Sequence, residues 1–415
     1  MARGTPTIKI KKVAYIMSRF PHLPETFILR EMDAMASLGW PISLYPLILQ
    51  KSVLIHQEAR PWLSRAQRLS IFSLDSAQAL AELILSRPRL FLSILRTVIA
   101  GYRKDLKVLV KALAIIPKSV LAAQRMQDEE IEHIHAHYAT YPALAAWIIH
   151  RLTNIPYSVT VHAHDIFVDR SMLKIKLEAT AFVVAISKFN RTFLIKHLGT
   201  GISRKIQVIH CGITPQDYSN LRTEHLGRDE PFRILTTGSL QPYKGQSHLI
   251  KACALLKERG VPFTCRIVGG GLLYNQLEKE ILNWHLEDQV TLLGAKTQDE
   301  VATLLAASDC YVQPSVIMPS GKMEGIPVSI MEALASGLPV IASDISGISE
   351  LVRPDETGYL VPPEDPKSLA DGLEFIYRNP SLAFQRARQG QELIRKEFEL
   401  SRSARKLAHA IGYSH

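Results

Sequence analysis

The sequence predicts an α/β protein made of two Rossmann-like domains that face each other across a cleft. The chain has 415 residues, 47% of them hydrophobic, and single cores stop growing above roughly 250 to 300 residues. Short apolar runs rich in branched residues alternate with longer helical patterns, which is typical of parallel sheets covered by helices. This alternation restarts after a polar stretch at 214–230, so two domains are expected.

Strands are expected wherever a short apolar run stands alone. Those of the first series are 13–17, 158–161, 182–186 and 206–209, and those of the second are 234–237, 265–268, 310–314 and 339–342. The predicted domains are 1–214 and 231–385. Residues 386–415 are predicted to be helical, and whether they cross back to the first domain stays open. Ligands of such sheets bind at the carboxyl ends of the strands.

Composition limits the compartment and the kind of partner. The four cysteines, at 211, 253, 265 and 310, form no C-x-x-C pair and suggest buried thiols in a reducing cytosol. The apolar run at 13–17 is too short for a signal peptide, and charges interrupt every stretch that approaches the ~18 apolar residues of a spanning helix. We therefore expect a cytoplasmic protein, soluble or peripheral on the inner membrane face. Its net charge of +10 implies an anionic partner.

A basic amphipathic insertion is predicted at about 80–126. Between Ser86 and Lys118 it carries eight lysines or arginines and one acid, Asp105, among many Leu, Ile and Val. Such a segment favours an anionic membrane surface. The alternative is that its apolar face packs on the N-terminal sheet while its cations stay in water.

The segment from Glu324 to Gly337 is the most specific motif in the chain. Pro327 suits a first helical turn and Gly337 a helix end, so a helix is expected from Pro327 to Ser336. Its free amides would bind an anion such as a diphosphate without a metal, and Gly325 would let the backbone come close. The carboxylates of Glu324 and Glu332 could each grip two sugar hydroxyls. Solvated glutamates in helical salt bridges are the alternative.

Two further glycine-containing turns follow predicted strands. Gly269 and Gly271 would allow a nucleotide to approach the backbone, although many turns are rich in glycine. The run ending in Leu293 and Gly294 is by itself an ordinary buried strand and turn.

Histidines alternate in two places, at 133, 135 and 137 and at 162 and 164, the second pair preceding Asp165. Alternate residues share one face of a strand. One interpretation is a metal-dependent hydrolase whose ligands are His135, His137 and an Asp or a third His. For His133 and His164 the alternative is a hydrogen-bonded histidine of the core.

Taken together, these motifs resemble the GT-B glycosyltransferases of family 4, whose signature is the Glu-x7-Glu element at 324–332. The resemblance covers most of the chain. The run 18–31 with Leu38-Gly39 looks like the subgroup that builds bacterial exopolysaccharides, colanic acid transferases among them, as does 209–212. The resemblance implies a retaining hexosyltransferase.

The resemblance also implies a donor site in the second domain. Glu324 would contact the donor sugar, Glu332 the ribose hydroxyls and Lys244 the diphosphate of a UDP- or GDP-sugar. The implied donor-binding residues are Gly238, Ser239, Lys244, Gly269, Gly271, Leu293, Gly294, Glu324, Gly325, Ile326, Pro327, Val328, Ser329 and Glu332.

An acceptor site is implied in the first domain. His162 stands where the family has a histidine that approaches the transferred sugar, so His162, Glu324 and Lys244 are the expected catalytic residues. The implied acceptor-side residues are Ser18, Glu25, Thr26, His137, His162 and Asp165. The expected acceptor is a lipid-linked sugar or an oligosaccharide.

In one respect the sequence departs from the family. An arginine usually follows the first glycine of the 238–245 element, where this chain has Ser239, so one phosphate clamp is missing. Arg266 or another cation could compensate. The departure leaves open a second hypothesis, a catalytically weak scaffold or binding protein of a polysaccharide assembly.

The expected mechanism needs neither a metal nor a cofactor. No residue suits the nucleophile of a double displacement, so we favour front-face transfer, in which the leaving diphosphate takes the acceptor proton. The sequence holds no Asp-x-Asp pair, the usual metal grip of other glycosyltransferases. Nucleic-acid binding is not expected, because aromatics make up only 7% and none alternate with arginines on a strand.

Overall fold

The computed structural model describes residues 9–21, 26–50, 59–219 and 230–414 and divides the chain into two compact units. The first unit holds residues 1–186, 190–209 and 403–415, and the second holds 187–189 and 210–402. The division thus falls at residue 210, a few residues before the predicted 214. The predicted C-terminal segment 386–415 is shared, because its last part, from Ser403, belongs to the first unit.

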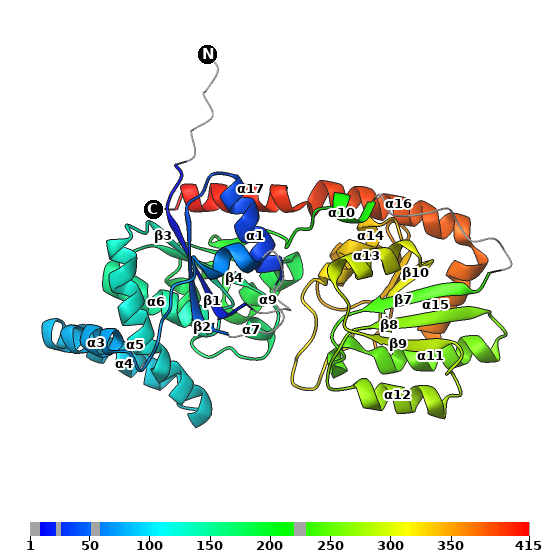
Figure 1. The fold of residues 1–415 in the computed structure, drawn as a ribbon, viewed down its shortest axis with the longest axis horizontal. Helices are drawn as coiled ribbons and strands as arrows, with labels where there is room; N and C mark the ends of the chain where they lie inside the picture. The colour runs from blue at the N-terminus through cyan, green and yellow to red at the C-terminus, as the bar shows by residue number, and fades with distance from the viewer. Residues whose placement is uncertain (1–8, 22–25, 51–58, 220–229, 415) are drawn as a thin grey trace, which may run out of the picture. The chain divides into compact units, whose positions relative to one another are not determined.

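The first unit is built on a six-stranded parallel sheet in the order β2-β1-β3-β4-β5-β6 (Figure 1). The chain therefore turns outward in both directions from β1 and β3, which makes their carboxyl ends the topological switch point where ligands of such sheets bind. The strands are β1 (Val13–Phe20), β2 (Ile42–Leu49), β3 (His133–His137), β4 (Tyr157–Val161), β5 (Phe182–Ala185) and β6 (Ile206–Val208).

Helices cover both faces of this sheet. One face packs on α1 and α17, and the other on α5 and α6. Apart from α17, the α-helices described in this unit are α1 (Thr26–Ser37), α2 (Arg60–Leu63), α3 (Leu74–Ser86), α4 (Pro88–Tyr102), α5 (Leu106–Asp128), α6 (Tyr141–Thr153), α7 (His164–Phe167), α8 (Leu173–Glu178) and α9 (Lys188–Leu198).

Helix α17 (Leu400–Gly412) completes the core of the first unit although it comes last in the chain. Ala404, Leu407 and Ile411 are fully buried in one cluster with residues of β1 and α1. The Lys11 ammonium donates to the Ser414 carbonyl, which ties the two ends of the described chain together. The first unit is therefore assembled from both ends of the sequence.

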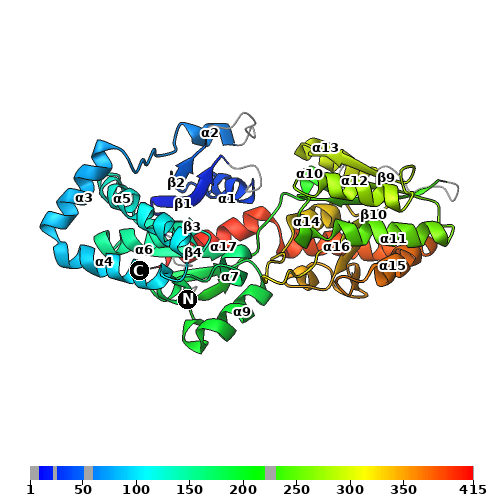
Figure 2. The same cartoon turned by 90° about the horizontal axis from the view of Figure 1, so that it is seen from below.

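The basic insertion forms three helices, α3, α4 and α5. Helix α5 packs on α6 and touches β2, and α3 and α4 pack on α5 (Figure 2). Helix α4 buries only Ile94, Val98 and Tyr102. Large apolar side chains around these helices are exposed, including Phe72, Leu85 and Leu106, at 95%, 82% and 72%. Packing on the rest of the unit thus accounts for only part of the insertion's apolar surface.

The second unit holds another six-stranded parallel sheet, in the order β12-β11-β10-β7-β8-β9. Counted within this unit, the order is 3-2-1-4-5-6 from one edge, which is that of dinucleotide-binding folds, with the switch point between β7 and β10. The strands are β7 (Phe232–Thr237), β8 (Phe263–Val268), β9 (Val290–Gly294), β10 (Cys310–Gln313), β11 (Val340–Ser343) and β12 (Tyr359–Val361).

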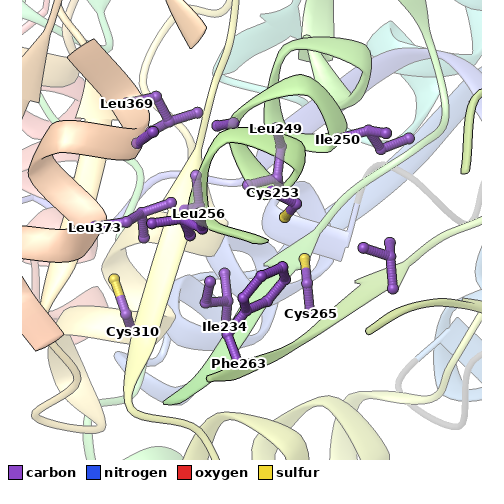
Figure 3. Close-up of a cluster of buried hydrophobic side chains, with 14 of the residues drawn as sticks. Ile234, Leu249, Ile250, Cys253, Leu256, Phe263, Cys265, Cys310, Leu369 and Leu373 are labelled. Carbon is purple, nitrogen blue, oxygen red and sulfur yellow. The ribbon is translucent and has the colours of Figure 1, made fainter. Parts of the chain in front are cut away.

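The core of the second unit contains three of the four cysteines. Cys253, Cys265 and Cys310 lie among aliphatic side chains such as Leu256 and Leu373 (Figure 3). The helices around this sheet are α10 (Gln216–Ser219), α11 (Gln246–Glu258), α12 (Tyr274–Asn283), α13 (Gln298–Ala306), α14 (Val328–Ala335), α15 (Pro366–Arg378) and α16 (Pro380–Glu397).

The predicted fold class is confirmed: each unit is a parallel Rossmann-like sheet flanked by helices. The helix predicted at 327–336 is α14, with Pro327 as its N-cap residue and Ser336 as its C-cap residue. The histidines at 133, 135 and 137 lie on one strand, β3, as expected. Among the described residues, no helix is long and apolar enough to cross a membrane.

Candidate functional site

The central feature of the second unit is an ion pair between Lys244 and Glu324. The ammonium of Lys244 contacts Oε1 of Glu324, and the two side chains are only 14% and 12% exposed. Burial lowers the pKa of Lys244, but the charges of Glu324 and Tyr243 raise it more, so the net pKa lies above its ordinary value. Lys244 therefore carries a positive charge at neutral pH.

Local structure places these two side chains at the switch point. Lys244 ends a 3-10 turn, Pro242–Lys244, shortly after β7, and Glu324 lies in the loop after β10. Gly245, at φ +73°, makes the turn into α11, where a Cβ would stand 1.8 Å from the Pro314 carbonyl oxygen. The loop of Glu324 is held because Gly325 accepts hydrogen bonds from Gly347 N and Ser346 Oγ, both at 3.0 Å.

A buried polar network supports this pair from the ends of β7 and β10. The Tyr311 hydroxyl donates to Gln313 Oε1 at 3.0 Å and lies 3.2 Å from Thr237 Oγ1. Gln313 Oε1 also accepts from Ser329 Oγ at 3.0 Å, which links the network to the first turn of α14. Burial raises the pKa of Tyr311, so its hydroxyl stays protonated. The network joins the two central strands to the helix start.

Three consecutive loops meet at the same edge of the sheet through backbone contacts. Gly238 N donates to Val268 O at 2.9 Å, and Gly269 N to Gly294 O at 2.8 Å. A Cβ on Gly269 would stand 1.9 Å from the Gly238 carbonyl oxygen, and Gly269 has a φ of +149°. Only glycine fits there. Gly271 packs in the same way against Leu240, and Leu293 lies beside Gly294 at the end of β9.

The rest of the predicted signature motif comes directly after Glu324. Ile326 is buried, Pro327 caps α14 without a side-chain hydrogen bond, and the helix begins at Val328. Glu332 lies on this helix and accepts a hydrogen bond from the Tyr218 hydroxyl at 2.9 Å. The structure thus brings Lys244 and Glu324 together, and the uncapped start of α14 follows Glu324 within a few residues. Such a start binds anions through its free amides.

The cation expected to replace the missing arginine is placed by the structure. Arg266 lies within β8, paired with Leu235 and Thr291 two residues before the strand ends. Lys322 instead has its ammonium 4.4 Å from the ring centroid of Tyr243, whose other neighbour is Lys244 at 5.7 Å. Lys322 is therefore a cation that shares the Tyr243 ring with Lys244, and the sequence reasoning missed it.

In the first unit, three side chains form a hydrogen-bonded chain at the carboxyl ends of β3 and β4. His137 Nε2 lies 3.1 Å from Glu31 Oε1, and His137 Nδ1 lies 3.4 Å from His162 Nε2. Burial raises the pKa of Glu31, but His137, His135 and Tyr15 lower it more, so Glu31 is a carboxylate. It therefore accepts a hydrogen bond from His137 Nε2. When each of the two rings carries one proton, His162 Nε2 donates to His137 Nδ1, and His162 Nδ1 is left as an acceptor.

Hydrogen bonds also fix the protons of His133 and His135. Ser414 Oγ donates to the Ile411 carbonyl, so it accepts from His133 Nδ1 at 3.2 Å. Since the proton of His133 is on Nδ1, its Nε2 is an acceptor. Ser158 Oγ lies 2.8 Å from both His133 Nε2 and His135 Nδ1, so its one proton goes to His133 Nε2 and it accepts a hydrogen bond from His135 Nδ1.

His135 Nε2 is consequently the acceptor for Thr160 Oγ1, 2.9 Å away. Burial lowers the pKa of His135 to about 3, with a further lowering by His137 against the raising effect of Glu31. Burial also lowers the pKa of His133 well below its ordinary value. His133 is thus a hydrogen-bonded core histidine, the alternative considered above.

The ligand set expected for a metal-dependent hydrolase is partly assembled. Glu31, His135 and His137 each offer an atom, all within 4.8 Å of one another, so the third group is Glu31 rather than an Asp or His. Each of these side chains already has protein partners, and a metal would displace the Thr160 hydroxyl from Nε2, the unprotonated ring nitrogen of His135. The geometry is thus explained by hydrogen bonding alone, and the hydrolase stays the weaker hypothesis.

The surroundings of His162 hold it in place. Asp165, buried at the start of α7, accepts from His162 N at 3.0 Å and from Ala139 N at 2.7 Å. The ring of Tyr138 lies 4.4 Å from that of His162, and Tyr138 has a φ of +76°, which is rare for an aromatic residue and frequent at functional sites. His164 begins α7.

The remaining acceptor-side predictions fall near the end of β1. Ser18 lies on β1, and Thr26 is the first residue of α1. Glu25 lies outside the described residues. Sequence reasoning missed Glu31, Tyr311, Gln313, Tyr218 and Lys322. Most of their partners come from distant parts of the chain. Glu31, the last residue of the recognised run 18–31, and Lys322, two residues before Glu324, were close enough to a recognised motif to be noticed.

The two parallel Rossmann-like sheets in one chain define a protein of the GT-B class. The model of "Glycosyltransferase Family 4" matches residues 53–217, and that of "Glycosyl transferases group 1" matches residues 217–393. The chain belongs to this glycosyltransferase family.

The curated relatives include bacterial exopolysaccharide proteins. The amylovoran biosynthesis glycosyltransferase AmsK of Erwinia amylovora is 40% identical over 168 residues, which are 40% of this chain and 41% of that protein. The putative colanic acid biosynthesis glycosyltransferase WcaL of Escherichia coli is 43% identical over 143 residues, 34% of this chain and 35% of that protein. These alignments span well under half of either relative.

Solved structures share the whole fold at low identity. Sucrose-phosphate synthase from Thermosynechococcus elongatus matches with a TM-score of 0.71 and 19% identity, over 96% of this chain and 97% of that one. Anabaena HepE in complex with UDP also has a TM-score of 0.71 and 19% identity, over 96% and 98%. At this identity the likeness concerns the fold.

Proposed function

We propose that this protein is a retaining, metal-independent hexosyltransferase that moves a sugar from a UDP- or GDP-sugar to an acceptor in the assembly of a bacterial exopolysaccharide. The buried Lys244–Glu324 pair beside the uncapped start of α14 carries this proposal. It puts a cation, a carboxylate and free amides where a sugar diphosphate needs them. The names of AmsK and WcaL support the exopolysaccharide role.

In the proposed reaction the protein positions the donor and neutralises charge. Lys244, with Lys322 in support, would hold the diphosphate, and the α14 amides would stabilise the charge that builds on the leaving oxygen. Glu324 would release Lys244 and accept hydrogen bonds from sugar hydroxyls, while Glu332 would hold the ribose. The leaving oxygen would take the acceptor proton, so neither a cofactor nor a metal is needed. Donor binding is therefore an exchange of partners for the Lys244–Glu324 pair.

The acceptor side of the proposal rests on the first unit. His162 Nδ1, left as an acceptor by the chain from Glu31, would receive a hydrogen bond from a sugar hydroxyl. The acceptor would be lipid-linked or a growing oligosaccharide, and the exposed apolar and basic residues of α3 to α5 would rest on an anionic membrane at the cytoplasmic face.

The experiment is a donor-hydrolysis screen with the purified chain. UDP- and GDP-sugars are supplied in chelator, and release of nucleotide diphosphate is followed for the wild type, Lys244→Met and Glu324→Gln. The matched controls are Lys296→Met and Glu300→Gln, an exposed lysine–glutamate pair of the same unit with a 3.0 Å contact.

Release from one donor, lost in the first two variants and kept in the controls, is the expected result. No release from any donor, even with membranes as a source of acceptor, would favour the scaffold hypothesis that Ser239 raises. Release only after zinc is added would favour the hydrolase.

A further inference from the structure

A pocket of about 410 Å³ opens at the carboxyl ends of β1 and β2 in the first unit. Its walls combine two kinds of residue. Leu47, Ile48, Ile71 and Ile115 are apolar, whereas Arg19, Lys111 and Lys118 are cationic, and none of the described residues that line it is acidic. A pocket with one charge sign and apolar walls selects for an amphiphilic anion.

Lys118 is the most informative of these residues. Only 9% of its surface is exposed, and its ammonium donates to the Leu47 carbonyl. Within the described ranges, Lys118 forms no ion pair with a carboxylate, and burial alone lowers its pKa. Buried lysines are rare unless they are paired. An anionic group in the pocket would supply the missing counter-charge.

Helix α5 presents the cations and the apolar wall together. Lys111, Ala114, Ile115 and Lys118 follow the i, i+3, i+4, i+7 spacing of one helix face, and all four line the pocket. Arg19 adds a third cation from the end of β1. Three cations exceed the single charge of a carboxylate and suit the charge and multiple oxygens of a phosphate.

A second hollow continues from the first. Its volume is about 680 Å³, and it shares Leu47, Ile48, Ile71 and Lys118 with the first. Beyond them its lining includes the aromatic ring of Phe72, which is 95% exposed. In the part of the chain that the structure describes, no acid lines this hollow either. Its lining also contains Arg68, Gln50 and Ser70. The two hollows, which together we name the α5 groove, thus provide a mostly apolar path that continues from Arg19, Lys111 and Lys118 and carries one more cation, Arg68.

We propose that the α5 groove binds the phosphate and the first part of the hydrocarbon chain of a phosphorylated lipid. The phosphate lies among Arg19, Lys111 and Lys118, and the chain follows Ile48 and Ile71 toward Phe72. This inference rests on the proposed function, because it makes the lipid phosphate the anchor of the acceptor. The groove and His162 both lie at the carboxyl edge of the same parallel sheet, so a sugar on that phosphate would lie along the edge that also carries His162.

The test measures binding of four probes to the full chain: decyl phosphate, decanol, decanoate and inorganic phosphate. The probes with a hydrocarbon chain are kept below the concentrations at which they aggregate. Decyl phosphate is expected to bind at least tenfold more tightly than the other three. Lys118→Gln and Lys111→Gln are each expected to weaken its binding by about tenfold or more, the size of one hydrogen bond to a charged group. Lys104→Gln is the control, because Lys104 is an exposed cation of the same insertion that lines neither hollow.

Other outcomes overturn the inference. Equal binding of decanol would make the groove merely apolar, and equal binding of inorganic phosphate would make it a simple anion site. Loss of binding in Lys104→Gln to the same degree would point to the net charge of the insertion. Lys111 is exposed, so its variant tests the idea even if Lys118→Gln does not fold.

The donor-hydrolysis assay separates the two proposals. Donor hydrolysis with no preference for decyl phosphate would reject the α5 groove alone. Selective binding of decyl phosphate without donor hydrolysis would reject the proposed function.

Discussion

His137 Nε2 lies 3.1 Å from Glu31 Oε1, although the two residues are 106 positions apart. The same carboxylate oxygen accepts a hydrogen bond from the Tyr15 hydroxyl at 3.1 Å. Glu31 lies on α1 and His137 ends β3, so this contact joins the helix after the first strand to the switch point of the sheet. Its consequence is a defined proton position on His137 and, through it, on His162.

The first prediction concerns that proton position. Glu31→Gln removes the charge that holds the proton on His137 Nε2, so the tautomer of His162 becomes mixed. In the proposed reaction kcat is expected to fall by about tenfold, the size of a hydrogen bond to a charged group, while the donor KM stays unchanged. Imidazole nitrogen NMR shifts of His162 report the tautomer. Glu178→Gln, at an exposed pair with Lys174, is the control, and a wild-type tautomer in Glu31→Gln would contradict the argument.

The second prediction concerns stability in acid. The pKa of His135 falls from 6.5 to about 3 on folding, and burial also lowers those of His133 and His162. The unfolded chain then binds protons that the folded one does not, so this stability is present above about pH 6.5 and is lost as pH falls below it. For His135 the slope is up to about 1.4 kcal/mol per pH unit.

Asp165 opposes this trend, because burial raises its pKa from 3.8 to about 6, and its contribution is lost as pH rises through about 6. Three histidines outweigh one aspartate, so denaturation of the first unit is expected to become easier from pH 7 to 5. His135→Gln should flatten the dependence, and His197→Gln, an exposed histidine on α9, should leave it unchanged. A slope that is the same in both variants would count against buried neutral histidines.

The third prediction follows from the Lys244–Glu324 pair. Glu324→Gln removes the largest influence that raises the pKa of Lys244 and leaves the burial that lowers it. The variant should therefore lose the charge of Lys244 at a lower pH than the wild type. Titration with UDP from pH 7 to 10 is expected to show binding that weakens at lower alkaline pH in Glu324→Gln. Parallel pH profiles in the two proteins would mean that Lys244 does not contact the diphosphate.

The fourth prediction uses two glycines with nearly the same backbone. Gly245 and Gly260 have φ of +73° and +69°, but a Cβ meets the Pro314 carbonyl at 1.8 Å in the first and nothing within 4 Å in the second. Each alanine variant places a non-glycine residue in the left-handed region, which costs about 1–2 kcal/mol of stability. Gly245→Ala should lose about 1–3 kcal/mol more and weaken UDP binding. Equal thermal midpoints would show that the loop after β10 yields freely.

The fifth prediction concerns the thiols. Cys253 has its pKa raised by a hydrogen bond with Cys265 and by burial, and burial raises that of Cys310 (Figure 3). Thiolates are the reactive form, so these cysteines should resist a thiol reagent in the folded protein. Only Cys211, which is partly exposed, is expected to react promptly, and all four should react after denaturation. Rapid labelling of Cys253 would show that the second core opens.

The sequence allowed the fold and the local structure around the Glu324 to Gly337 motif to be predicted, because these depend on local signals. Pro327 and Gly337 mark the ends of α14 through backbone preferences that act within one turn. The alternation of His133, His135 and His137 indicates one strand face without any knowledge of its neighbours. Glycines at strand ends are visible in the same way.

The rest depends on pairing between distant segments. Nothing near Glu31 in the sequence points to His137, and nothing near Tyr218 points to Glu332. The strand β2 was also missed, because Ser43, Tyr45 and Pro46 interrupt its apolar pattern. Pro46 nevertheless pairs with Met17 in the sheet. The sequence did not show that Arg266 lies in β8 between Leu235 and Thr291, and its role as a compensating cation stays a prediction.

Helix α17 has a consequence for the order in which this protein can mature on the ribosome. All six strands of the first sheet are synthesised before residues 210–402 of the second unit, yet Ala404, Leu407 and Ile411 come only after them. The nascent first unit therefore carries an uncovered apolar face throughout translation of the second, and it reaches its final packing only when the chain is nearly complete.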